Sequence, residues 1–168
     1  MMKWQAVINY PVDVVIKAFN DVEVRKKWDT DFGKGPMEIM SKTVEGDLTT
    51  ELMYIYVKMP FVFTDRDLIQ TRKTWYPYHT TAKSMLQVCT NSTHPKYPPK
   101  EKPIRCEIFI QANYFEAIGP NSTKLCSLGH IDMKFGSTMF GMMKSKSGDR
   151  VKEIIKGLNK GCKIVAGK

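Results

Sequence analysis

Residues 59–68, MPFVFTDRDL, are the stretch that decides how this 168-residue chain folds. Three apolar residues follow a proline, and an Arg-Asp pair then leads into a second apolar run. Arg72 lies four residues further on, and Glu51 lies upstream in a segment rich in large apolar residues. This order predicts two strands joined by an apolar loop, with one charged side chain projecting from each strand.

Glu51 and Arg72 both share a strand face with apolar residues. Side chains two positions apart on a strand point to the same side. Glu51 therefore shares a face with Met53 and Ile55, and Arg72 shares one with Leu68. A charge on an apolar face is costly unless it is paired, so we expect a buried Glu51–Arg72 ion pair. Such a pair could anchor a ligand or only pin two strands; exposed charges on irregular strands are the third alternative.

The clearest strand signal lies in residues 104–114. Polar residues occupy most odd positions, and the even positions are apolar: Ile104, Cys106, Ile108, Ile110 and Ala112. This alternation is typical of an antiparallel strand with one wet face, and we expect the even face to point toward a cavity. A weaker alternation includes Leu86, and further strands are predicted near residues 37–44, 47–58, 67–76 and 123–133.

Helical spacing appears at both ends of the chain. After a predicted strand at residues 4–9, Pro11 suits a first helical turn, and residues 15–22 place their apolar side chains on one face. A short second helix is predicted around residues 24–28. The chain closes with a longer helix whose apolar stripe consists of Val151, Ile154, Ile155, Leu158, Cys162 and Val165.

This order of elements predicts an α+β protein of the helix-grip architecture. In that fold a curved antiparallel sheet, here of about seven strands, wraps around a long C-terminal helix and leaves a space between them. The chain contains no linker, repeat or low-complexity tract. We therefore expect a single domain that spans residues 1–168.

Composition limits the possible partners. The net charge of +9 and the pI near 9.4 favour an anionic partner, either a nucleic acid or a negatively charged membrane surface. The sequence has no run of 18 apolar residues and no signal-peptide pattern at its start. Four cysteines without CxxC spacing favour reduced thiols in a cytoplasmic protein over disulfides or a zinc site.

No pattern in the sequence indicates catalysis. The three histidines show no metal-ligand spacing with one another or with cysteine. GxSxG, P-loop and paired-carboxylate motifs are missing, and His130 with Asp132 is better explained by ordinary strand residues. We therefore expect no enzyme activity, no cofactor and no metal.

Four segments resemble one known family. They are residues 28–29 (WD), 65–68 (DRDL), 104–107 (IRCE) and 130–134 (HIDMK). Together they are similar to the START domains, the steroidogenic-acute-regulatory-protein-related lipid-transfer family. Leu68 replaces the usual aromatic, and the family's N-terminal helix and first strands have no counterpart. The resemblance implies a minimal START form.

The resemblance implies intracellular lipid binding and transfer, with one phospholipid or sterol held in an apolar cavity between the sheet and the C-terminal helix. It places the Arg72 guanidinium at the lipid phosphate. Tyr76 occupies the position of an acidic residue that helps hold choline, so choline selectivity is not supported; a sterol hydroxyl fits the same polar pair. The expected lipid-binding residues are Glu51, Met53, Ile55, Leu68, Arg72, Leu86, Ile108, Ile110, Ala112, Ile155 and Leu158.

Two groups of residues are expected to touch an anionic membrane. One is the apolar loop formed by Phe61, Val62 and Phe63, which could instead pack as ordinary core. The other is the basic flank of the last helix, which could instead be a solvated surface: Lys152, Lys156, Lys160 and Lys163. We expect Arg66 and Asp67 to tie down the preceding loop.

The expected protein is a cytoplasmic monomer that visits membranes peripherally and transiently. Two rival functions remain open. The helix-grip fold also hosts enzymes of the cyclase/aromatase type. A nucleic-acid-binding module would account for the basic charge, but the sequence lacks a basic strand face interleaved with stacking aromatics, and we expect no nucleic acid partner.

Overall fold

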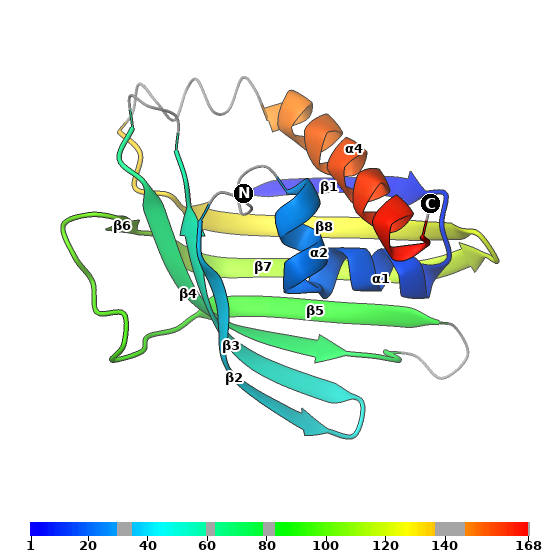
Figure 1. Ribbon diagram of the computed structural model, residues 1–168, viewed down its shortest axis with the longest axis horizontal. Helices are drawn as coiled ribbons and strands as arrows, with labels where there is room; N and C mark the ends of the chain where they lie inside the picture. Colours follow the sequence, from blue (N-terminus) through cyan, green and yellow to red (C-terminus); the bar gives the residue numbers. More distant parts are fainter. Residues whose placement is uncertain (30–34, 60–62, 79–82, 137–146, 168) are drawn as a thin grey trace.

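The computed structural model describes residues 1–29, 35–59, 63–78, 83–136 and 147–167 (Figure 1). Its elements follow one another in the order β1 (Met2–Ile8), α1 (Val12–Asn20), α2 (Val22–Trp28), β2 (Met37–Glu45), β3 (Leu48–Val57), β4 (Arg66–Trp75), β5 (Ser84–Asn91), β6 (Ile104–Arg105), β7 (Glu107–Gly119), β8 (Ser122–Asp132) and α4 (Ser147–Val165).

The strands form one open sheet in the order β1-β8-β7-β5-β4-β3-β2. All neighbours along this path are antiparallel, and the two-residue β6 adds a short parallel pairing to β4. The helices α1, α2 and α4 lie over one face of the sheet (Figure 1). The predicted α+β class and helix-grip order are confirmed, with the short β6 as the strand beyond the expected seven.

Local signals explain the two short helices. Asp21 lies between α1 and α2, and its side chain accepts hydrogen bonds from the amides of Glu23 and Val24 at 2.9 and 3.1 Å. It is thus the N-cap of α2. Trp28 ends this helix and donates its indole N–H to the Ala18 carbonyl at 2.8 Å. That bond fastens the end of α2 to α1.

The C-terminal helix α4 rests mainly on α1 and α2. Its buried residues Leu158 and Cys162 join the cluster that α1 and α2 form over β1, β7 and β8. Gly157 and Gly161 allow close approach, because a Cβ at either position would lie less than 3 Å from Trp28. Helix α4 thus packs mainly on the two short helices, and the expected cavity between the sheet and α4 stays a prediction.

A bulge in β7 overturns part of the predicted strand pattern. The β7–β8 register shifts between Ile108 and Ile110, so Phe109 is the extra residue. Ile108 is buried, but beyond it the buried residues are Asn113 and Phe115. The prediction that Ile110 and Ala112 point inward is wrong, because one extra residue turns the following side chains to the other face.

Strand β5 also orients differently from its predicted pattern. Met85, Gln87 and Cys89 are buried, whereas Leu86 is half-buried. Because neighbours on a strand face opposite ways, Leu86 lies on the outer face of the sheet, away from the helices. The predicted inward position of Leu86 is wrong, because the inner face of β5 includes the polar Gln87.

The connection between β5 and β6 covers part of the outer face. Tyr97 stacks on Tyr54 of β3, with ring centroids 3.7 Å apart. Arg105 donates to both carboxylate oxygens of the buried Asp67, at 2.7 and 3.0 Å. Arg66 donates to the Met133 carbonyl at 2.8 Å. Arg66 and Asp67 thus tie connecting segments to β4.

Candidate functional site

Glu51 and Arg72 form the predicted buried ion pair. They face each other directly across β3 and β4. The Arg72 Nε and Nη2 atoms lie 2.7 and 2.6 Å from Glu51 Oε2, and the residues are only 4% and 5% exposed. Lys42 Nζ approaches the other carboxylate oxygen at 3.6 Å. Among the described residues no acceptor is placed on Arg72 Nη1, so this atom can serve another acceptor.

The ion pair lies in the wall of a cavity of about 530 Å³ between α1 and strands β2–β5. Helix α1 contributes Ile16 and Asn20, and Met85 adds an apolar surface from β5. This volume falls in the range of about 300–1,000 Å³ that is typical of ligand sites.

A second cavity of about 60 Å³ adjoins the same arginine. Its apolar wall consists of Met53, Ile55 and Leu68, together with residues such as Met37 and Ile131. Ile108 packs in the same apolar cluster. The structure therefore brings together the predicted residues Glu51, Met53, Ile55, Leu68, Arg72 and Ile108.

A second arginine, Arg25 of α2, also lines the small cavity. Its Nε atom lies 3.3 Å from Asp29 Oδ2, and its guanidinium sits 4.6 Å above the Phe19 ring. Burial lowers the pKa of Arg25, and although Asp29 opposes this effect, the positive charge of Arg72 lowers it further. Two guanidiniums, the buried Arg72 and the half-buried Arg25, thus line one cavity, and each is paired with its own carboxylate.

Buried amide side chains extend this polar region across the sheet. Gln87 donates to Asn20 at 2.7 Å, Asn113 donates to Gln87 at 3.2 Å, and Ser127 donates to Asn113 at 2.8 Å. Apolar periodicity does not identify Gln87 and Asn113, because the alternation along β5 and β7 predicts the opposite face of each strand to be the buried one. Their only sequence signal is polarity within strands whose other face is apolar.

The remaining predicted lipid-binding residues lie elsewhere. Ile155 and Leu158 of α4 pack with the helices and β1, and neither lines the cavities beside Arg72. Leu86, Ile110 and Ala112 lie on the outer face, and Ile110 is 38% exposed. The two cavities beside Arg72 are thus formed by α1, α2 and the inner face of the sheet.

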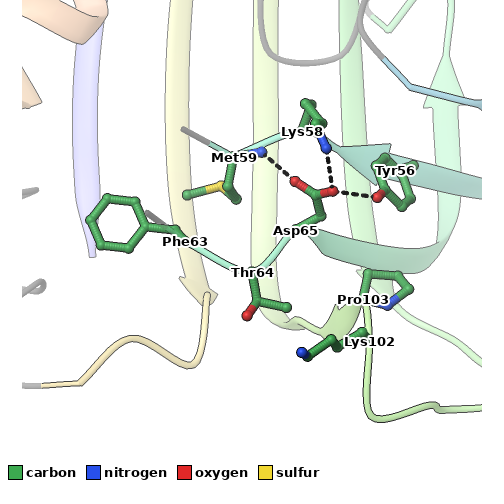
Figure 2. Close-up of a pocket in the computed structure, with 8 residues that line it drawn as sticks. All are labelled: Tyr56, Lys58, Met59, Phe63, Thr64, Asp65, Lys102 and Pro103. Carbon is green, nitrogen blue, oxygen red and sulfur yellow. Dashed lines mark hydrogen bonds and ion pairs between the residues drawn. The ribbon is translucent and has the colours of Figure 1, made fainter. Parts of the chain in front are cut away.

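A separate pocket of about 640 Å³ lies where β3 leads toward β4 (Figure 2). The Asp65 carboxylate lies at the centre of its polar contacts. It accepts hydrogen bonds from Lys58, Tyr56 and the Met59 amide at 2.8, 2.5 and 2.9 Å. These bonds, Lys58 first, lower the pKa of Asp65 to about 2. Phe63 is half-buried and lines this pocket.

Several other predicted features have clear positions. Lys152, Lys156, Lys160 and Lys163 are exposed on α4, whereas Phe61 and Val62 lie outside the described residues. The four cysteines are free thiols, and burial raises the pKa of Cys89, Cys106 and Cys162 to about 11. Over the described ranges, no cluster of potential metal ligands occurs. No helix in this part of the chain is long and apolar enough to cross a membrane.

The sheet packs helices on one face and carries a buried ion pair on that same face, which is the helix-grip architecture. A profile of the START domain matches residues 1–163. The chain belongs to the START domain family, which is known for lipid binding and transfer.

START domain-containing protein 10 of mouse and of human are each 28% identical to this chain over 153 residues. The match covers 90% of this chain and 49% of each relative, so the chain spans about half the length of these relatives. The crystal structure of human STARD10 superposes with a TM-score of 0.80 at 21% identity, over 95% of this chain and 62% of that one. Human StAR-related lipid transfer protein 5 gives a TM-score of 0.79 at 17% identity, over 96% and 74% of the two chains.

Proposed function

We propose that this chain is a single lipid-binding domain that extracts one phospholipid from a membrane and releases it at another. The observation that carries the proposal is the buried guanidinium of Arg72, with the half-buried Arg25 beside it on one cavity inside a START fold. The lipid phosphate binds Arg72, whose charge Glu51 balances. The apolar part of the lipid lies against Met53, Ile55, Leu68 and Ile108.

The polarity of the inner face favours a phospholipid over a sterol. A phosphate accepts several charge-assisted hydrogen bonds and suits a guanidinium. A sterol offers one hydroxyl, which is a poor match for two arginines and the amides of Gln70, Gln87 and Gln111. A sterol is therefore the second candidate, supported by the apolar wall alone.

Two physical terms drive uptake in this scheme. Burial of the apolar part of the lipid contributes about 25 cal/mol per Å² removed from water. Arg72 is buried, so the low local dielectric strengthens its attraction for the phosphate relative to the same contact at the surface. The lipid is released when it meets another membrane, which offers an apolar interior to its apolar part and a polar surface to its phosphate.

The test of this function removes both charges of the ion pair together. An Arg72→Met/Glu51→Gln protein leaves no unpaired buried charge, so it can fold. Loss of a charged hydrogen bond in a dry site is worth about 1.5–3 kcal/mol, which corresponds to a fall of about tenfold or more in affinity. We expect that fall in extraction of labelled phosphatidic acid and phosphatidylcholine from vesicles.

The matched control is Arg105→Met/Asp67→Asn, which removes an ion pair between an arginine and a buried acid on the opposite face of the same strand. It should extract phospholipid at the wild-type level once its folding is verified by circular dichroism. Equal extraction by both double variants would contradict the anchor role of Arg72. Extraction of labelled cholesterol but of neither phospholipid would assign the site to a sterol.

We also propose that the lysines of α4 bring the domain to anionic membranes. Lys152, Lys156, Lys160 and Lys163 are exposed on one helix, and basic residues near an anionic bilayer attract the protein within a Debye length. Changing all four to glutamine should slow transfer between anionic vesicles roughly tenfold at low salt, while affinity for the lipid stays the same. The measurement is the transfer rate at two salt concentrations.

Its control neutralises four exposed lysines outside α4, namely Lys3, Lys73, Lys83 and Lys100. This control has the same net charge as the α4 variant, so any difference between them reflects position. Equal transfer rates for the two variants would show that the α4 lysines form only a solvated surface.

A further inference from the structure

The outer face of the sheet is apolar in a region where an uncovered antiparallel sheet is usually polar. The strand register places two rows of side chains next to each other across β4, β5, β7 and β8. We call these residues the outer-face patch; all are half-buried, and they are Trp75, Leu86, Val88, Ala112, Tyr114, Cys126 and Leu128.

The described helices do not cover this patch. They pack on the inner residues Met85, Phe115 and Leu125, which lie on the opposite face of the same strands, and Figure 1 shows α1, α2 and α4 on one side of the sheet. Tyr78, which is 42% exposed, extends the patch by packing edge-on against Tyr114 with ring centroids 6.3 Å apart. Contiguous apolar surface of this kind marks interaction sites.

One row of the patch, formed by Val88, Ala112 and Leu128, has a lysine at each end. Lys73 pairs in register with Val88, and Lys3 pairs in register with Leu128. Both lysines are exposed, and within the described part of the chain neither has an acidic partner. The row therefore offers apolar contacts in its middle and an unpaired positive charge at each end.

The spacing of these charges suits a helix. Four strand-to-strand steps separate β4 from β1 along the sheet, and strands lie about 4.8 Å apart. The two lysine backbones are thus separated by about 19 Å, which is the length of about 13 residues of α-helix.

We propose that the outer-face patch docks an amphipathic helix of a partner protein. Its apolar stripe crosses the strands over Leu86 and Ala112, and acidic side chains about 13 residues apart pair with Lys3 and Lys73. Charge complementarity selects this partner. A second copy of the chain would bring lysines against lysines in a protein of net charge +9, and like charges oppose association.

The experiment selects peptides from a displayed library of amphipathic helices randomised at their polar positions. The wild-type chain is the immobilised target of the selection. Peptides that also bind the Leu86→Ser/Leu128→Ser protein are discarded, because they bind outside the outer-face patch. We expect selected peptides to carry Asp or Glu about 12–14 residues apart. A synthetic selected peptide should bind Lys3→Glu/Lys73→Glu protein at least tenfold more weakly, and its lysine-substituted version should regain binding to that protein.

The matched control is Lys83→Glu/Lys100→Glu, which makes the same change of net charge away from the patch and should bind the acidic peptide as the wild type does. Peptides without an acidic pair, or equal binding to the two charge-reversed proteins, would overturn the proposal. A wild-type dimer in sedimentation that Leu86→Ser/Leu128→Ser abolishes would also overturn it, because the occupant would then be a second copy. These outcomes do not depend on lipid binding.

Discussion

Replacing Arg72 alone with methionine is expected to lower the free energy of unfolding by about 3–5 kcal/mol. The substitution leaves the Glu51 carboxylate buried beside apolar side chains without its guanidinium partner. A buried charge without a partner lowers the stability of the fold by far more than an intact ion pair contributes to it. Lys42, at 3.6 Å and largely exposed, recovers only part of this loss.

Urea unfolding of Arg72→Met and of Arg72→Met/Glu51→Gln separates the two effects. The double variant should regain more than half of the lost stability, because it contains no unpaired charge. If the single variant is as stable as the wild type, the Glu51 carboxylate is solvated, and the ion pair described for the site does not exist in solution.

Replacing Gly157 and Gly161 together with alanine is expected to lower the stability of the protein, because it disturbs the packing of α4 on α2. Inside a helix, glycine to alanine normally stabilises by about 1 kcal/mol. Here a Cβ on Gly161 would lie 2.5 Å from Trp28 Cδ1, and one on Gly157 would lie 2.8 Å from Trp28 Cε3. Overpacking costs about 1–3 kcal/mol at each position, so the clash outweighs the helix propensity.

The control for this prediction lies in the same helix. A Cβ on Gly148 meets no heavy atom within 4 Å, so Gly148→Ala should leave the melting temperature unchanged or raise it slightly. The double variant should melt well below the wild type, since each kcal/mol corresponds to about 2–4 °C in a chain of this size. A melting temperature for Gly157→Ala/Gly161→Ala at or above that of Gly148→Ala would contradict this prediction. It would show that the Trp28 side chain moves aside without a loss of stability.

The sequence predicts the order of elements well because each carries its own periodicity. Alternation indicates the strands, and the 3.6-residue stripe indicates α4. The Glu51–Arg72 pair was also predictable, because a charge on an apolar strand face demands a partner and the two strands are neighbours in sequence. These inferences need only the local pattern of each segment and the pairing of two consecutive strands.

The inner face of the sheet was harder to predict. The bulge at Phe109 changes which residues of β7 face the cavity, and one inserted residue leaves no distinct mark in composition. On β5 the inner residue Gln87 is polar and the outer residue Leu86 is apolar, so apolar periodicity indicates the wrong face. Arg25 was missed because its role depends on how α2 packs over the sheet.

The central claim, a lipid anchored at Arg72, is tested most directly by native mass spectrometry of the protein purified from its own cells. Wild-type protein should retain a bound phospholipid, identified by its mass after gentle release. Arg72→Met/Glu51→Gln protein should lose this adduct, and Arg105→Met/Asp67→Asn protein should keep it. Wild-type protein without bound lipid, or the same adduct on the Arg72→Met/Glu51→Gln protein, would contradict the account.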